Sequence, residues 1–199
     1  MELSSINILE KYVEGKDKDT YKILEEIYAD DAIVQFEIHS DRISFPDTIS
    51  GNIQIAKALS ADFNKKYTDV KTYYLSKPRS DQNIINGQKW LVIMRDIELD
   101  KTRVGTGYYD WELTHSGSNL KVQKHKISIH EMLELTDTGS KLLQDLQSRL
   151  EYPFVEKKSA SNIMSSHPEL EDIVKYILNN HLLQVGGFKF ADCKSGNTG

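Results

Sequence analysis

The sequence predicts an α+β protein, because segments with helical spacing come first and segments rich in β-branched and aromatic residues follow them. The helical segments occupy roughly the first 66 residues, and the strand-rich segments continue to about residue 133. Helical spacing then returns in the last 65 residues. We therefore expect a first domain at residues 1–134 and a helical C-terminal extension at residues 135–199.

Apolar residues at spacings of three and four predict three helices in the first part of the chain. They cover residues 4–14, 19–29 and 52–66. Ser4 or Ser5 is expected to cap the first helix, and Gly15 to end it. Asp19 is the expected N-cap of the second helix.

Strands are predicted where Val, Ile, Thr and aromatic residues accumulate between turn signals. These segments are residues 32–38, 70–76, 89–99, 104–114 and 120–133. The turn signals between them include Asn86-Gly87, a sequence typical of tight hairpins. The last three segments are therefore expected to form an antiparallel meander.

The last predicted strand changes its phase. Leu120 and Val122 place apolar groups at even positions, whereas Ile127 and Ile129 place them at odd positions. Side chains alternate along a strand with a period of two, so one residue near positions 123–126 must shift the pattern. A β-bulge would do so and would bend the strand, or the two ends of the strand pack against different partners.

The C-terminal extension shows two helical patterns. The first is a leucine stripe made of Leu142, Leu143, Leu146 and Leu150 and ended by Pro153. Residues 156–166 are interpreted as a linker, and residues 166–169 have the spacing of a capping box that opens a second helix. That helix is expected to stop at Gly186, with a disordered tail after it. We expect the extension to cover the sheet or to form a dimer contact, with a lid over a pocket as the alternative.

Composition narrows the class of protein. The formal net charge is −5 and the lysines are scattered among acids, which argues against a nucleic-acid partner. The single cysteine, Cys193, allows no disulfide within the chain and no cysteine zinc site. There is no signal-peptide pattern and no apolar run long enough to span a membrane. We therefore expect a cytoplasmic protein without a membrane partner.

The segment YADDAIV at positions 28–34 lies between two helical patterns and a strand pattern. A loop containing Pro46 follows it, and Gly51-Asn-Ile-Gln-Ile then leads the next helix. This arrangement resembles the NTF2-like superfamily, in its steroid isomerase and SnoaL-like branch, over about residues 5–132. The resemblance implies a cone of three helices and a curved sheet around a mostly apolar pocket, in a protein that pairs as a homodimer through its sheet.

The resemblance also implies where catalytic groups would lie. The isomerases of that family use a helix-one tyrosine, a carboxylate base on the first strand and a protonated acid on a later strand. Tyr12, sixteen positions before Tyr28, matches the tyrosine, and Asp110 matches the placement of the acid. Phe36 occupies the position of the base, and a phenyl ring accepts no proton. The adjacent Glu37 points to the opposite face of a strand, so isomerase chemistry by this route is disfavoured.

Two further candidates have alternative interpretations. His125 shares strand parity with Ile127 and Ile129, so it faces inward and suits acid–base work, or it is a hydrogen-bonded or surface histidine. Asp110 faces the pocket by resemblance. It faces solvent if it shares a polar face with Tyr108 and Glu112.

Other chemically conspicuous residues are assigned no catalytic role. Asp30 and Asp31 are interpreted as turn residues at the end of a helix. His39 is expected in solvent near the mouth of the cone, and His130 has the opposite strand parity to His125, so the two make no metal pair. No metal and no cofactor is expected. Cys193, near the C-terminus, is not expected to be a nucleophile.

Three functions remain open. The first is binding of a small apolar molecule in the cone by Tyr12, Tyr28, Phe36, Tyr73, Trp90 and His125. The second is a SnoaL-like isomerase, cyclase or dehydratase that uses His125 as acid or base, with Tyr12 or Asp110 as the oxyanion donor. The third is a protein-interaction or dimerisation module whose pocket is filled by its own side chains.

Overall fold

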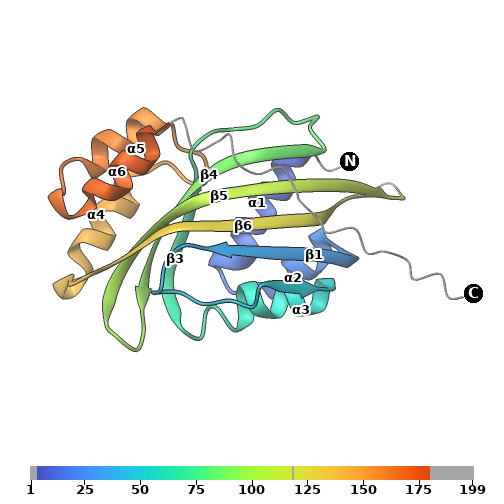
Figure 1. The fold of residues 1–199 in the computed structure, drawn as a ribbon, viewed down its shortest axis with the longest axis horizontal. Helices are drawn as coiled ribbons and strands as arrows, with labels where there is room; N and C mark the ends of the chain where they lie inside the picture. Colours follow the sequence, from blue (N-terminus) through green and yellow to red (C-terminus); the bar gives the residue numbers. More distant parts are fainter. Residues whose placement is uncertain (1–3, 118, 180–199) are drawn as a thin grey trace, which may run out of the picture.

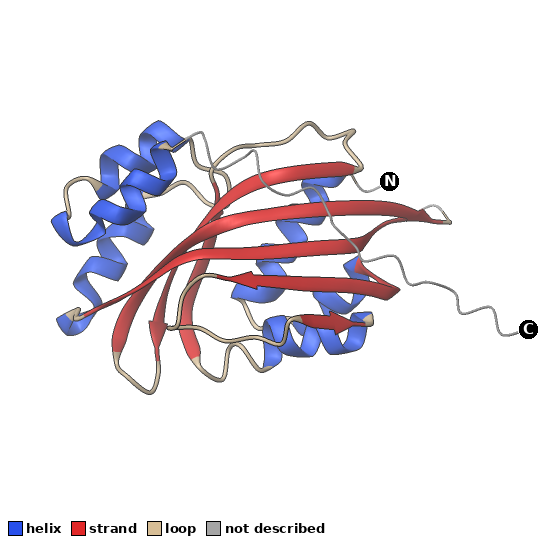
Figure 2. Ribbon diagram, viewed as in Figure 1, coloured by secondary structure: helices blue, strands red, loops and turns tan. Residues whose placement is uncertain are grey.

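A computed structural model describes residues 4–117 and 119–179. Six strands form one strongly curved sheet in the order β2-β1-β6-β5-β4-β3, and helices α1, α2 and α3 lie behind it on the concave side (Figure 1). Helices α4, α5 and α6 form a separate layer at one end (Figure 2). The structure therefore confirms the α+β cone class, in which one apolar core fills the space between the sheet and the first helices.

Helix α1 covers Ser5–Asp17 and begins with a capping box. The Ser4 hydroxyl accepts the Asn7 backbone N–H, and the Asn7 side chain accepts the Ser4 N–H in return. Gly15 does not end the helix as predicted. It lies inside the helix, where an added Cβ would be 2.9 Å from the Leu24 side chain, so its role is close packing of two helices.

The next two helices are shorter than predicted. Helix α2 covers Tyr21–Ile27, and Thr20 precedes it without a side-chain hydrogen bond, so Asp19 is not the N-cap. Asp19 instead takes a positive φ of 52° in the turn between the two helices. Helix α3 covers only Asn52–Ala56 and continues as one π-helical turn at Lys57–Ala61.

The predicted strands are present in the predicted order, with the short strand β2 in addition; β3 and β4 begin and end earlier than predicted, and Asn86-Gly87 lies within β4 instead of in a hairpin turn. They are β1 Tyr28–Ile38, β2 Thr48–Ser50, β3 Tyr67–Tyr74, β4 Ile84–Asp96, β5 Lys101–Ser116 and β6 Asn119–Leu135. The antiparallel meander β4-β5-β6 is confirmed, and β1 joins β6 in parallel. Asp30 and Asp31 lie in the irregular start of β1, because α2 ends at Ile27 and the strand follows without a turn.

The predicted phase shift in β6 is a β-bulge at Gln123. Glu112 pairs with Lys124 and the next residue, Leu113, pairs with Val122, which leaves Gln123 as the extra residue. A second bulge leaves His130 as an extra residue further along the strand, where Thr106 pairs with Glu131 and Gly107 with Ile129. The two bulges bend the central strands around the core.

The C-terminal layer contains three short helices. Helix α4 covers Lys141–Arg149, α5 covers Lys157–Met164 and α6 covers Glu171–Leu178, preceded by short 3₁₀ turns at Thr138–Ser140 and Pro168–Leu170. The linker predicted at residues 156–166 is therefore wrong, because Ala160 and Met164 give this segment a buried helical face. Ser166 does not cap α6; its hydroxyl donates to the Ile163 carbonyl. Gly186, the tail and Cys193 lie outside the described residues.

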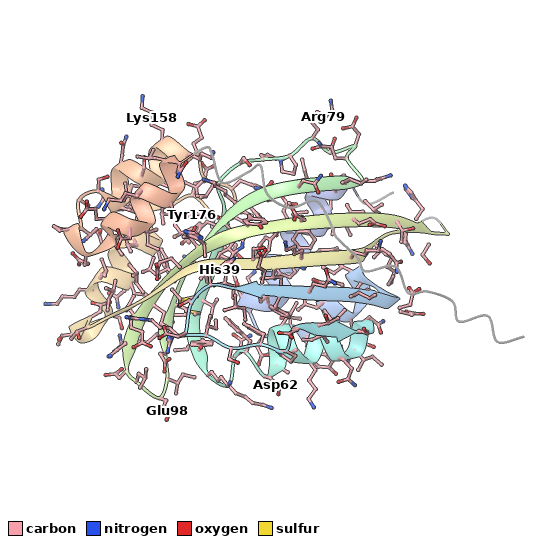
Figure 3. All side chains as sticks on the ribbon, viewed as in Figure 1. His39, Asp62, Arg79, Glu98, Lys158 and Tyr176 are labelled. Carbon is pink, nitrogen blue, oxygen red and sulfur yellow. The ribbon has the colours of Figure 1, made fainter. Side chains whose placement is uncertain are left out.

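These helices pack on the outer face of the sheet. Strands β3, β4 and β5 contribute Tyr73, Leu91, Ile93 and Val104 to a second apolar cluster, which also includes Leu75 just after β3, and the helices contribute Leu143, Leu146, Ile173 and Ile177. Charged side chains such as Lys158, Arg79, Glu98 and Asp62 project from the rim of the molecule (Figure 3). Within residues 4–117 and 119–179, the helices are too short or too polar to cross a membrane.

Candidate functional site

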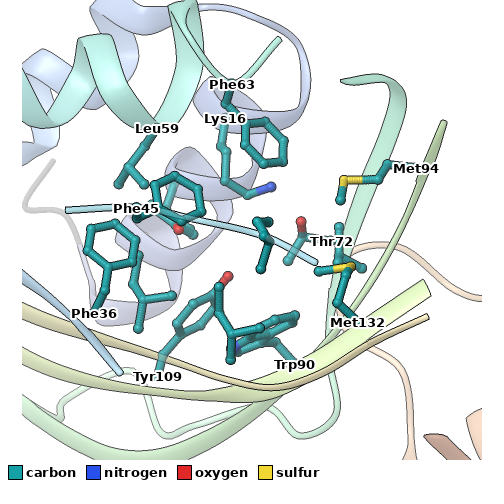
Figure 4. Close-up of a pocket in the computed structure, with 15 residues that line it drawn as sticks. Lys16, Phe36, Phe45, Leu59, Phe63, Thr72, Trp90, Met94, Tyr109 and Met132 are labelled. Carbon is teal, nitrogen blue, oxygen red and sulfur yellow. The ribbon is translucent and has the colours of Figure 1, made fainter. Parts of the chain in front are cut away.

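The cone encloses a small apolar cavity between α1, the loop at residues 39–47 and the sheet. Its volume is about 40 Å³, which is room for about three water molecules. Aromatic, aliphatic and methionine side chains make most of the wall, among them Phe36, Trp90, Met94, Tyr109 and Met132 (Figure 4). Typical ligand pockets measure roughly 300 Å³ or more, so protein side chains occupy most of the space that a ligand would need.

An aromatic stack closes the mouth of the cone. The ring of Phe45, from the loop at residues 39–47, stacks on Phe36 at 4.5 Å and lies 6.4 Å from Phe63. Outside this stack lies a groove of about 430 Å³. Ile43, Phe45 and Phe63 line both the cavity and the groove, and we call these three residues the mouth plug.

Strand β1 presents a phenyl ring to the cavity and a carboxylate to the other side. Phe36 lines the cavity. The Glu37 carboxylate accepts hydrogen bonds from Tyr108, Ser128 and Lys126 on the outer face at 2.7–3.1 Å. Partial burial opposes ionisation, but the bonds from Lys126 and Ser128 outweigh it and lower the pKa of Glu37. The alternation predicted from the sequence is thus present.

His125 lies at the narrow end of the cone, sealed from solvent. Its Nδ1 is 2.7 Å from the Tyr28 hydroxyl, and its ring stacks on Trp111 at 3.6 Å. The edge of Tyr12 meets the same ring at 5.1 Å. Burial lowers the pKa of His125 well below its ordinary value, so the imidazole is neutral at neutral pH. His125 and Tyr28 lie behind Tyr12 and Tyr109 and do not line the cavity.

Asp110 faces away from the cavity, on the outer side of β5. Its neighbours Tyr109 and Trp111 belong to the cone core, and side chains alternate along a strand. The carboxylate is nevertheless buried, and its Oδ1 accepts the Gly87 backbone N–H at 2.6 Å. Burial raises the pKa of Asp110. It is therefore neither a cavity group nor a solvent-exposed acid, and it lies beside the irregular stretch of β4 that contains Gly87.

The cavity therefore gathers only part of the predicted site. Tyr12, Phe36 and Trp90 line it. Tyr73 does not, because the adjacent Thr72 takes the inward position and Tyr73 packs edge-on against Tyr152 at 5.7 Å under the C-terminal helices. Tyr12, His125 and Asp110, the three predicted catalytic residues, do not face one cavity.

Several lining residues are missed by sequence reasoning. Lys16 is the clearest, and a signal for it exists, because it lies four residues after Tyr12 and so on the same face of α1. Phe45 has no such signal, because it belongs to an irregular loop whose path no periodicity predicts. Met94 shares strand parity with Trp90 on β4, so a signal for it exists as well, whereas Thr72 reaches the cavity through the pairing of β3 with β4.

Lys16 and Asp17 form an ion pair at the end of α1. Their charged atoms are 2.7 Å apart, and their side chains are 8% and 2% exposed. Asp17 also accepts the backbone N–H and the hydroxyl of Thr72 at 2.6 and 3.0 Å, and the Tyr152 hydroxyl at 3.2 Å. The pair thus joins α1, β3 and the segment between α4 and α5 beside the cavity.

The described ranges offer no metal site: none of their His, Cys, Asp and Glu side chains gather in threes around a common point. The ionisable groups of the cavity wall are Lys16 and the buried phenols Tyr12 and Tyr109. Burial raises the pKa of both phenols above the usual value. What the arrangement can do at neutral pH is enclose an apolar molecule and donate hydrogen bonds to it.

Comparison with known proteins places the fold. No family model matches the chain, and no curated protein sequence matches it. The structure of LinA matches with a TM-score of 0.52 at 15% identity, over 65% of this chain and 85% of that chain. A hexachlorocyclohexane dehydrochlorinase, LinA type 2, matches with a TM-score of 0.51 at 18% identity, over 65% and 84%. A Salmonella enterica protein described as NTF2-like matches with a TM-score of 0.49 at 12% identity.

The fold and the cavity together define a cone with a small apolar interior, of the same fold as the LinA structures. The resemblance stated from the sequence is confirmed as a resemblance of fold. At these identities the solved structures carry no activity over to this chain.

Proposed function

We propose that this protein binds a small, mostly apolar molecule inside the cone. The observation that carries the proposal is the mouth plug, since Ile43, Phe45 and Phe63 line both the apolar cavity and the outer groove and so lie between them. Moving Phe45 outward would join the two spaces into one pocket. The joined space exceeds the roughly 300 Å³ of an ordinary ligand pocket, because the groove alone measures about 430 Å³.

The loop that carries Phe45 is weakly fixed. Between Ser40 and Pro46 no backbone group of the described chain takes part in a backbone–backbone hydrogen bond. The Arg42 carbonyl accepts a hydrogen bond from the guanidinium of Arg103. Arg103 also forms an ion pair with Asp96 at 2.7 Å. Segments with few backbone hydrogen bonds open at low free energy. Displacing this loop to open the cavity therefore requires less free energy than unfolding the sheet.

Binding is favoured over catalysis by the chemistry of the wall. The acid–base function expected from the sequence needs His125 and either Tyr12 or Asp110 in one cavity. His125 is sealed behind two tyrosines, and Asp110 lies on the opposite face of the sheet. The base position holds Phe36. The hexachlorocyclohexane dehydrochlorinase of similar fold has an apolar substrate in its name, but the ligand class proposed here rests on the cavity.

The test uses naphthalene as a neutral apolar probe. Binding would be measured by equilibrium dialysis, alongside native mass spectrometry of the freshly purified protein for a co-purified molecule. Phe45→Ala removes the plug, and Val92→Phe fills the cavity from β4. Ile84→Ala alters an exposed side chain of the same strand and serves as the control. Far-UV circular dichroism confirms that each variant is folded.

We expect one bound naphthalene per chain in the natural protein. Phe45→Ala should strengthen binding, because no plug has to be displaced before the ligand enters. Val92→Phe should weaken it at least about tenfold, which corresponds to ~1.4 kcal/mol. If the folded natural protein and Phe45→Ala bind neither naphthalene nor 2-acetylnaphthalene, a ketone on the same ring system, and carry no co-purified molecule, the proposal fails. The interaction module with a filled pocket then becomes the better explanation.

A further inference from the structure

Lys16 brings a cation to the wall of an otherwise apolar cavity. Its side chain comes from the last turn of α1, and in Figure 4 its nitrogen points in among the lining side chains. The ammonium lies 4.9 Å from the centre of the Phe63 ring. No other lining residue carries a charge at neutral pH. A buried charge in such surroundings costs free energy unless hydrogen-bond partners compensate it.

Hydrogen-bond accounting leaves Lys16 with donors to spare. An ammonium group has three N–H donors and no acceptor. Over residues 4–117 and 119–179, Asp17 supplies the one acceptor within hydrogen-bond distance, at 2.7 Å. Trp90, another lining residue, has an indole N–H without a partner in the same ranges. The polar groups of this wall that lack a partner are therefore hydrogen-bond donors, and a ligand with a hydrogen-bond acceptor would satisfy them.

The charge balance decides which kind of acceptor fits. Lys16 and Asp17 together have no net charge, and Asp17 is fully occupied by Lys16, Thr72 and Tyr152. A carboxylate ligand would leave one uncompensated negative charge in an apolar cavity, which is costly. A pure hydrocarbon would leave the Lys16 donors unmet. An uncharged oxygen acceptor satisfies the ammonium without disturbing the neutral pair.

From these three observations we infer that Lys16 is the polar recognition residue of the cavity and that its ligand is an uncharged, mostly apolar molecule bearing one oxygen acceptor, such as a ketone or ester carbonyl. The inference rests on the proposed function and adds the ligand's chemical class to it. The site is at the C-terminal turn of α1, apart from the Tyr28–His125 pair at the narrow end of the cone. Asp17 acts as a positioning residue, because it fixes Lys16 from the side away from the cavity.

Three probes of nearly the same shape separate the chemical classes. They are 2-acetylnaphthalene, a neutral ketone; 2-isopropenylnaphthalene, a hydrocarbon of matching outline; and 2-naphthoate, an anion. Dissociation constants would be measured by equilibrium dialysis for the natural protein and for Lys16→Met, which keeps an unbranched apolar side chain. The double variant Lys16→Met with Asp17→Asn avoids leaving a buried carboxylate without its cation. Lys18→Met is the matched control, because that lysine pairs with Glu14 at the surface of the same helix.

The natural protein is expected to bind the ketone at least about tenfold more tightly than the hydrocarbon or the carboxylate. In both Lys16 variants the ketone should lose that preference over the hydrocarbon, whereas Lys18→Met should retain it. Equal binding of ketone and hydrocarbon by the natural protein would overturn the inference and leave the proposed function intact. Tighter binding of the carboxylate would overturn it in favour of an anion site. Absence of binding by all three probes, and by naphthalene, would overturn both.

Discussion

The sealed imidazole of His125 makes a quantitative prediction about acid stability. Burial lowers its folded-state pKa well below the ordinary value of about 6.5, whereas the unfolded chain retains that value. The unfolded state therefore binds more protons as the pH falls through about 6.5, and folding stability decreases with it. Between pH 7.5 and 5.5 the unfolded imidazole goes from about 9% to about 91% protonated. With the folded imidazole neutral throughout, the loss is about 1.4 kcal/mol.

The perturbation that isolates this contribution is His125→Gln. Glutamine keeps a polar group near the Tyr28 hydroxyl and does not titrate. The free energy of unfolding would be measured by urea denaturation at pH 7.5 and at pH 5.5. We expect the natural protein to lose about 1.4 kcal/mol more than the variant over this interval. The exposed His39→Gln removes a histidine outside the cone and serves as the control for the substitution itself.

Equal losses in the natural protein and in His125→Gln would refute the reasoning, because His125 would then titrate alike in both states. Such a result would mean that water reaches the narrow end of the cone. It would also reopen acid–base chemistry by His125, which the sealed geometry disfavours.

Two further substitutions, each with a control, test the packing of the sheet and of the C-terminal layer. Gly107→Ala should destabilise the fold by about 3 kcal/mol or more, the upper range for overpacking, because the new Cβ would lie 1.8 Å from the Ser128 carbonyl oxygen. Gly139→Ala, at a φ of 72° in open space, should lower the free energy of unfolding by only about 1–2 kcal/mol. If urea denaturation gives similar losses of stability for both glycines, Gly107 is not a position of close packing. Leu146→Ala should cost about 2–5 kcal/mol by leaving a cavity under α4. The exposed Leu178→Ala should stay within about 0.5 kcal/mol, and equal thermal shifts for the two leucines would show that the C-terminal layer is not a cooperative part of the fold.

The C-terminal layer bears on how copies of the chain would associate. The resemblance to NTF2-like proteins implies pairing through the outer face of the sheet. In this protein α4, α5 and α6 already occupy the part of that face formed by β3, β4 and β5. The remainder, around Glu37, Tyr108 and Lys126, is a polar network. The homodimer therefore stays a prediction, to be checked by native mass spectrometry, and the cytoplasmic location stays one as well.

Much of the fold is predictable from local pattern. The order of helices and strands, the meander and the bulge near Gln123 follow from periodicity, because burial imposes a period on each element. The errors occur where a contact distant in sequence overrides local preference. Gly15 reads as a helix stop but serves close packing against Leu24. Residues 156–166 read as a linker but form α5, because Ala160 and Met164 pack on the outer face of the sheet.

The candidate site is less predictable than the fold. Strand alternation correctly separates Phe36, which lines the cavity, from Glu37 on the outer face. Parity also places His125 inside the cone, but it cannot tell a cavity wall from the packed core behind that wall. Asp110 lies on the face opposite to the cavity and is still buried, a combination that an alternating pattern does not anticipate.

The sequence by itself determined the fold class, and it placed Phe36, whose ring accepts no proton, at the position where the family resemblance implies a base. Only the tertiary structure decided that the cone is closed, since Phe45 reaches Phe36 and Phe63 from an irregular loop. It also decided that Lys16, which the sequence patterns did not single out, is a buried donor beside Asp17. Periodicity reports which face of an element is buried. The contents of a cavity depend on which elements meet there, and that information is not local.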